Sequence, residues 1–207
     1  LTLTALFWSG NMVLGRGIRA DVPPMALAFW RWAIAFALVL PLAAPHFRSQ
    51  WPLLAKGWKP ALFLGLLGLG DAWMLFAVVV WAIYTVGLAW RPAGVHPMLM
   101  LAAMTAVGLA ALLPAYLWEI GQGRHINVQV SSLAALAYVG IFPSFLGYIF
   151  YNRGVAEIGA SQASLFIHLM PVFGTLLSAL FLGEIPLWYH YLGFGLIFTG
   201  IWLTMKK

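Results

Sequence analysis

The sequence contains no cysteine, which excludes a disulfide framework, a thiolate nucleophile and a cysteine-ligated metal site. Charge is also scarce, because only 8% of the 207 residues are charged, whereas a soluble domain carries about 25%. With 63% hydrophobic residues, the chain could not cover a water-exposed surface with polar groups. Its apolar residues form continuous runs rather than short alternating segments, so the sequence predicts an all-α integral membrane protein and not a β-barrel.

Acidic residues are the rarer of the two charge types, with five Asp and Glu against eleven Lys and Arg. In a soluble protein the resulting charge of +6 would suggest a nucleic-acid partner. Here the basic residues gather at the ends of apolar runs, where they act as topology signals, so the expected partner is the lipid bilayer and not nucleic acid. No signal peptide is visible, and the chain begins with Leu1 inside an apolar run, so we expect the true N-terminus to be missing.

Apolar runs of roughly membrane-spanning length occur along the whole chain, at 1–18, 25–45, 60–70, 72–90, 97–118, 131–151, 162–183 and 187–205. The region 60–90 is the exception. Read as one helix, it would be about 46 Å long, exceed the ~30 Å hydrocarbon core and place Asp71 in mid-run. Divided between Gly70 and Asp71, its first part is too short to span and its second is a good helix.

An internal duplication accounts for this junction. The stretch WSGNMVLGRGIRADVPPM at 8–25 matches WAIYTVGLAWRPAGVHPM at 81–98 when the chain is shifted by 73 residues. We interpret 1–70 as a first repeat, with helices 1, 2 and the start of 3, and 71–207 as a second repeat, with helices 6 to 10. Residues 146–207 have no counterpart in the first repeat, so we infer that roughly 60 to 80 residues are absent between Gly70 and Asp71.

The distribution of positive charge agrees with this interpretation. With the gap restored, seven basic residues fall on one side of the membrane and three on the other, whereas seven uninterrupted helices give six against four. The two sides are Arg48, Lys56, Lys59, Arg91, Arg153, Lys206 and Lys207 against Arg16, Arg19 and Arg124. Two repeats of five helices each have opposite orientations, which is the architecture of secondary transporters that work by alternating access around a central cavity.

Several stretches resemble a known family. FWSGNMVLGRGI near the start, and SLFIHLMPVFGTLLSALFLGEIPLWYHYLGFGLIFTGIWL near the end, resemble EamA-type carriers of the drug/metabolite transporter (DMT) superfamily. The SGN and HLMP stretches look most like the YddG-type aromatic amino acid exporters. The resemblance implies ten helices, of which about eight are represented here, with both termini cytoplasmic. It also implies export of aromatic and other neutral amino acids across the bacterial inner membrane. From the residues themselves we expect no cofactor and no metal, since cysteine is absent and the histidines are scattered.

Polar residues within the first helix of each repeat are candidates for the substrate cavity. Trp8 and Asn11 are three residues apart and share a helix face, and their repeat equivalents are Trp81 and Tyr84. An amide within the bilayer must hydrogen-bond inward, so Asn11 faces protein or a water-filled cavity. Two readings stay open, namely contact with substrate and hydrogen bonding between helices.

The stretch SFLGYIFYN at 144–152 places Ser144, Tyr148, Tyr151 and Asn152 on one broad face. Tyr148 lies nearer the middle of its span and is the better cavity candidate, with packing between helices as the alternative. Tyr151 and Asn152 lie by the charged side, where a tyrosine more often anchors the membrane interface.

In the next helix, Ser161, Ser164 and His168 recur at helical spacing. An ionisable group within the membrane is a functional candidate, so His168 either carries a coupling proton or lines the cavity as a neutral side chain. Pro171 lacks an N–H and is expected to kink this helix. Since no carboxylate within a span accompanies His168, we favour facilitated export over tight proton coupling.

Arg31 lies six residues into its span and either contacts a substrate carboxylate or reaches the interface beside two tryptophans. The alternative functions are export of drugs or other metabolites within the same superfamily and, from other classes, a membrane scaffold or an intramembrane enzyme. The five histidines are scattered and neither HExxH nor GxSxG occurs, so the sequence does not favour an enzyme. The exact substrate and the oligomeric state are left open.

Overall fold

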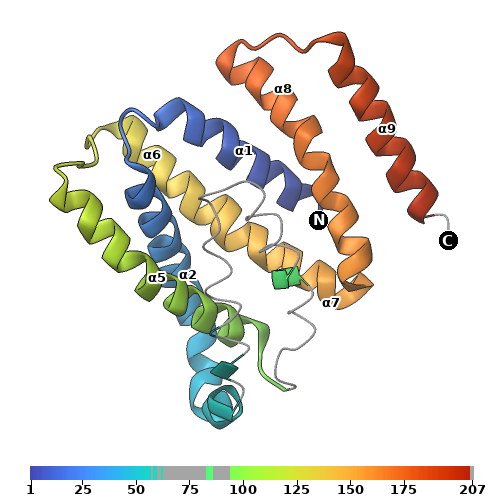
Figure 1. The fold of residues 1–207 in the computed structure, drawn as a ribbon. Coiled ribbons are helices and arrows are strands. Elements are labelled where there is room, and N and C mark those ends of the chain that lie inside the picture. Colours follow the sequence, from blue (N-terminus) through green and yellow to red (C-terminus); the bar gives the residue numbers. More distant parts are fainter. Residues whose placement is uncertain (57, 60–61, 63–82, 86–93, 206–207) are drawn as a thin grey trace. The chain divides into compact units, whose positions relative to one another are not determined.

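The structure is a computed structural model that describes residues 1–56, 58–59, 62, 83–85 and 94–205. Within these ranges the chain forms helices and no strand, which confirms the all-α fold class (Figure 1). The elements are α1 (Thr2–Ile18), α2 (Pro24–Lys56), α5 (Pro97–Gly121), α6 (Val130–Val139), the π-helix η2 (Gly140–Leu146), α7 (Gly147–Leu165), the 3-10 helix η3 (Phe166–Leu169), α8 (Met170–Leu182) and α9 (Trp188–Met205).

Three helical segments of the described residues are long and apolar enough to cross a membrane, namely Pro24–Ala55, Pro97–Gly121 and Val130–Leu182. The last has 53 residues and would be about 80 Å long as one straight helix, more than twice the ~30 Å core. Gly159 interrupts it with φ 83° and ψ 160°, a conformation that no helix contains and that glycine adopts without strain. The segment therefore supplies helical lengths for two crossings, one on each side of Gly159.

The chain divides into two compact units. The first unit combines Leu1–Ala20 with Leu146–Lys207, and the second comprises Asp21–Phe145. Neither unit follows the repeat boundary that the sequence predicts, because each joins segments from both sides of residue 70. Gly70 and Asp71 lie outside the described residues, so the boundary and the absent segment stay predictions.

In the second unit, α2 packs against α5 and α6. Ala35, Val39 and Ala43 recur every four residues along α2 and are fully buried, and their small side chains let the neighbouring backbone approach closely. Hydrogen bonds join the end of α5 to the start of α2, and the start of α5 to the later part of α2, so the two helices are antiparallel. Their first residues, Pro24 and Pro97, are separated by the repeat offset, since 97 − 24 = 73.

In the first unit, α1 packs against α7, η3 and α8. The buried residues Ala5, Ser9 and Val13 recur at four-residue spacing along α1, which directs one stripe of the helix into the unit. After α8, Gly183 adopts a left-handed conformation with φ 69°, which ends the helix as glycine commonly does. The chain then returns in α9, as Figure 1 shows in orange and red.

Two helices extend beyond the apolar runs of the sequence. The run 25–45 predicts one span, but α2 continues to Lys56, and its added turns carry polar residues such as Arg48 and Gln50. These added turns lie past the hydrophobic length that a crossing needs. The region after residue 151 also stays helical, up to the break at Gly159, and an exposed ion pair of 2.7 Å between Arg153 and Glu157 spans one turn there.

Candidate functional site

An aromatic cluster forms where α1 meets α7 in the first unit. The ring of Trp8 lies 5.7 Å from that of Tyr148 and 5.3 Å from that of Tyr151, centroid to centroid. Both tyrosines are buried and Trp8 is half-buried. These separations fall within the range that edge-to-face and tilted aromatic pairs prefer. Two of the candidates from the sequence, Trp8 and Tyr148, are thus neighbours.

Hydroxyl groups fasten α1 to the elements around this cluster. The buried Ser9 hydroxyl lies 3.0 Å from the carbonyl oxygen of Met170, at the start of α8, and 2.7 Å from that of Ala5. Thr4 donates a longer hydrogen bond of 3.4 Å to the carbonyl of Gly147, at the start of α7. In a helical membrane protein such bonds hold helices together, because lipid offers no competing partner.

The helix changes type immediately before Pro171. Residues 166–169 form the 3-10 helix η3, and His168 lies within it with an exposed side chain. Pro171 follows in the first turn of α8, where its missing N–H removes no interior hydrogen bond of that helix. The hydroxyl of Ser164 donates a hydrogen bond of 2.8 Å to the carbonyl of Ser161 within its own helix. His168 is therefore the accessible ionisable group at this irregular segment.

The remaining sequence candidates are not brought into this cluster by any described contact. Asn11 is half-buried on α1, one turn beyond Trp8. Tyr84 is buried and belongs to the second unit, whereas Trp81 lies outside the described residues. Arg31 is half-buried on α2, with its guanidinium carbon 5.2 Å from the ring centroid of the adjacent Trp32. Contact of these residues with a substrate stays a prediction.

The sequence did not predict that Tyr151 is buried against Trp8. Its place beside charged residues suggested an interface anchor, but its side chain is only 1% exposed and it packs on Trp8 more closely than Tyr148 does. The i, i+3 spacing of the two tyrosines already placed them on one helix face. What the spacing could not supply was the identity of the neighbouring helix, α1, which is distant in the sequence.

All four acidic side chains in the described part of the chain have partners. The buried Glu119 of α5 accepts hydrogen bonds from the backbone N–H groups of Met25 (3.2 Å) and Ala26 (2.8 Å), in the first turn of α2. The other three acidic side chains pair with neighbours, namely Asp21 with Asn127, Glu157 with Arg153 and Glu184 with Arg16. Glu119 acts as a helix cap supplied from another helix, and it satisfies N–H groups that α2 itself leaves free.

Two histidines meet at the opposite end of the α2–α5 pair. The imidazole of His96 stacks on that of His46 with ring centroids 3.6 Å apart, and its Nδ1 accepts a hydrogen bond from the N–H of Met98 at the start of α5. The backbone N–H of His96 donates to the side-chain oxygen of Gln50. Partial burial, and secondarily the neighbouring His46, lower the pKa of His96 below its ordinary value.

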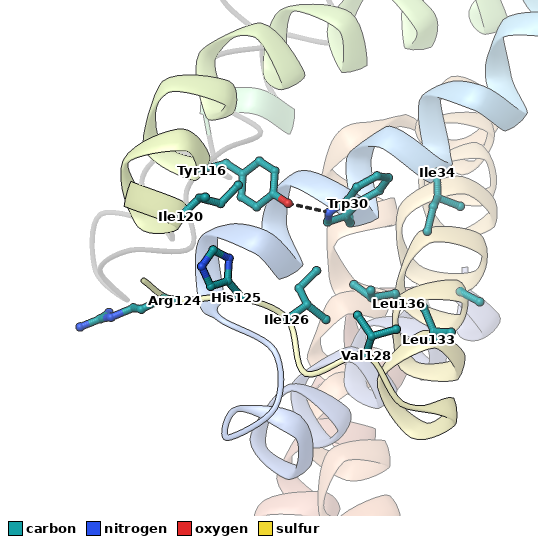
Figure 2. A pocket seen from close by; sticks show the side chains of 11 residues that line it. Trp30, Ile34, Tyr116, Ile120, Arg124, His125, Ile126, Val128, Leu133 and Leu136 are labelled. Atoms are coloured by element: carbon teal, nitrogen blue, oxygen red, sulfur yellow. Dashed lines mark hydrogen bonds between the residues drawn. The ribbon is translucent and has the colours of Figure 1, made fainter. Parts of the chain in front are cut away.

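A pocket of about 520 Å³ lies in the second unit between α2, the end of α5, the connecting segment 122–129 and α6. Figure 2 shows Trp30 and Tyr116 across one wall, joined by a hydrogen bond of 3.1 Å from the indole nitrogen to the phenol oxygen. Phe29 stacks on the other side of Tyr116, with ring centroids 4.7 Å apart. The basic lining residues, Arg124 and His125, both lie on the connecting segment.

Comparison with known proteins places this helical fold in a class of membrane transport proteins. The model of the EamA-like transporter family matches residues 1–72 and 68–206, and the chain belongs to this family. Its relatives include the uncharacterized transporter YyaM of Bacillus subtilis, 32% identical over 110 residues, and an uncharacterized transporter of Archaeoglobus fulgidus, 26% identical over 139. The matches cover 53% and 67% of this chain, and 36% and 47% of those relatives.

A shorter relative matches over most of its own length. The putative permease-like protein YdzE of Bacillus subtilis is 33% identical over 70 residues, which are 34% of this chain and 90% of that protein. The chain spans only about a third to a half of the length of YyaM and of the Archaeoglobus transporter. No solved structure matches the chain. The family confirms the DMT-type resemblance and indicates a multi-pass membrane protein of a transporter family and not an enzyme.

Proposed function

We propose that this chain is part of a secondary transporter that exports small neutral metabolites, with aromatic and other amino acids as its leading substrates. Membership of the EamA-like transporter family supports transport in general. We place the protein in the bacterial inner membrane because of its resemblance to EamA-type carriers, and we place both termini in the cytoplasm, which the positive-charge asymmetry of the sequence supports. Transport proceeds by alternating access between two inverted repeats, around a cavity to which α1, α7 and α8 contribute.

The choice of substrate depends on one observation, namely that the acidic side chains of the described residues already bind other groups of the protein. A cationic drug within a membrane calls for an unengaged carboxylate, because burying an unpaired positive charge is costly. In the described part of the chain, Asp21, Glu119, Glu157 and Glu184 all bind other groups of the protein. A neutral substrate with an aromatic ring suits the Trp8, Tyr148 and Tyr151 cluster better.

Flux into liposomes that carry the complete protein tests this proposal. Labelled Phe, Trp, Thr and a cationic dye are offered with and without an imposed pH gradient. Saturable amino acid flux that ignores the gradient is the expected result, with His168 lining the cavity. Flux driven by the gradient would show that transport is coupled to protons, and would assign the coupling site to His168 or to a carboxylate outside the described residues. Flux of the dye alone, or of nothing, would overturn the assignment of substrates.

A pair of matched variants tests the aromatic cluster. Trp8→Phe is expected to lower flux of Trp and Phe by about tenfold and to affect Thr less, because a smaller ring leaves a gap against Tyr148 and Tyr151. Trp188→Phe is the control, since Trp188 is 75% exposed at the start of α9. Equal flux of all substrates in both variants would show that the cluster is a packing feature only.

A further inference from the structure

We propose that the pocket between α2, α5 and α6 is a lipid site, in which one acyl chain of an anionic phospholipid lies with its phosphate at Arg124 and His125. The pocket lies entirely within the second unit and shares no residue with the aromatic cluster of α1 and α7. Its volume of about 520 Å³ is within the range of small-molecule sites. The proposal is independent of the substrate that the transporter carries.

The depth of the pocket matches the depth of a lipid leaflet. Trp30 and Ile34 lie six and ten residues beyond the start of α2, about 9 and 15 Å along the helix axis. Leu133 and Ala137 lie three and seven residues beyond the start of α6 at Val130, about 4.5 and 10.5 Å along its axis. Since the hydrocarbon core is about 30 Å thick, the pocket reaches about halfway through it from the end that bears segment 122–129.

The interior of the pocket has little to offer a polar ligand. The Trp30 indole N–H donates to the Tyr116 hydroxyl at 3.1 Å, and this hydrogen bond is exposed. The other lining residues on α2 and α6, namely Ile34, Leu133, Leu136 and Ala137, carry no polar side-chain atom. A zwitterionic metabolite placed among Ile34, Leu133 and Leu136 would lose the hydration of its ammonium and carboxylate groups without replacement. A hydrocarbon chain loses nothing in the same place, so the interior favours an acyl chain.

The mouth of the pocket is basic. Figure 2 shows the Arg124 side chain extending outward, where a headgroup would lie, and His125 near Tyr116. A guanidinium binds phosphate oxygens through paired hydrogen bonds, and tryptophan and tyrosine favour the membrane interface. Of the two carboxylates near this segment, Glu119 is buried and accepts from the start of α2, and Asp21, in the turn before α2, accepts a hydrogen bond of 3.1 Å from Asn127. Arg124 and His125 lie on the connecting segment itself and supply the attraction for an anionic headgroup.

Native mass spectrometry of the complete protein, titrated with dioleoylphosphatidylglycerol or dioleoylphosphatidylcholine, tests the site. We expect retention of one anionic lipid with at least about tenfold preference over the zwitterionic one. Ala137→Trp fills the pocket and should abolish that retention, whereas Ala134→Trp, the same change on α6 outside the lining, should not. Arg124→Gln should remove the preference between headgroups, and Arg19→Gln, which changes another exposed arginine, should keep it.

Photolabelling keeps the proposal testable if Ala137→Trp fails to fold. A phosphatidylglycerol with a diazirine at mid-chain should label the peptide that contains 130–139, and glycerol phosphate in excess should not prevent the labelling. Labelling spread evenly over all helices would overturn the site. Full competition by glycerol phosphate would also overturn it, because it would show a site for free phosphate rather than for lipid.

Discussion

The carboxylate of Glu119, near the end of α5, accepts a hydrogen bond of 2.8 Å from the backbone N–H of Ala26, in the first turn of α2. The repeat offset of 73 relates Glu119 to His46, since 119 − 73 = 46. His46 in turn stacks on His96, at the start of α5. Two residues separated by the predicted repeat offset thus lie at opposite ends of this antiparallel helix pair, a carboxylate at one end and an imidazole at the other.

Replacing Glu119 with alanine should destabilise the protein by about 1–3 kcal/mol, because one buried and one partly buried N–H group at the start of α2 lose their acceptor. Glu119→Gln keeps one acceptor oxygen and should cost less. Thermal unfolding in detergent measures the difference, and Glu157→Gln, which breaks only an exposed pair, serves as the control. Equal melting temperatures for Glu119→Ala and the control would show that the cap contributes nothing.

The end of the pair that contains His96 should loosen in acid. Its pKa lies below the ordinary value of about 6.5, so the folded protein favours the neutral ring, which accepts the Met98 N–H. Stability from this group is complete above pH 6.5 and is lost as the pH falls through the lowered pKa. His96→Asn, which keeps a capping acceptor without titrating, should reduce the fall in melting temperature between pH 7.5 and 5.5.

His125→Asn is the control for this pH effect, because His125 is exposed in the segment after α5 and caps no helix in the structure. It should leave the pH dependence close to that of the unaltered protein. A melting temperature that falls as steeply in His96→Asn as in the unaltered protein would assign the pH dependence to other histidines.

Arg16 joins the end of α1 to α8 and to the segment after it. Its guanidinium lies 3.2 Å from the Glu184 carboxylate, with both side chains about half exposed, and it also donates to the buried hydroxyl of Ser178. Glu184→Gln should cost less than about 1 kcal/mol, since exposed ion pairs contribute little. Arg16→Met should lower the melting temperature more, because it also leaves the Ser178 hydroxyl without this donor. A larger decrease in melting temperature for Glu184→Gln than for Arg16→Met would exclude a contribution from the Arg16–Ser178 hydrogen bond.

Gly140 has no room for a side chain. A Cβ there would lie 2.6 Å from the Cβ of Ile34, an atom that only a backbone shift can move. Gly140→Ala should therefore cost about 1–3 kcal/mol, as overpacking does. Gly174→Ala is the matched control, since no described atom lies within 4 Å of its added methyl and alanine favours the helix. Equal unfolding temperatures for the two variants would contradict the close approach of α2 and η2.

Parts of the fold were predictable because they depend on local pattern. The apolar runs 25–45 and 97–118 predicted two helices, and α2 and α5 begin within one residue of these runs, at Pro24 and Pro97. Helical spacing also placed Tyr148 and Tyr151 on one face. The runs 131–151 and 162–183 predicted a division between two spans, and the break at Gly159 lies in the interval between them, but the pattern did not identify the residue that carries it.

The sequence by itself determined the membrane environment and the helical class, because composition and the order of apolar runs record them directly, and the resemblance of particular stretches identified the family. Only the tertiary structure decided which helices are neighbours. It put Trp8 against Tyr148 and Tyr151, turned Glu119 toward the start of α2, and formed the pocket beside Trp30 and Tyr116. The physical reason is that periodicity defines the face a helix buries, whereas the partner of that face depends on packing between segments far apart in the chain.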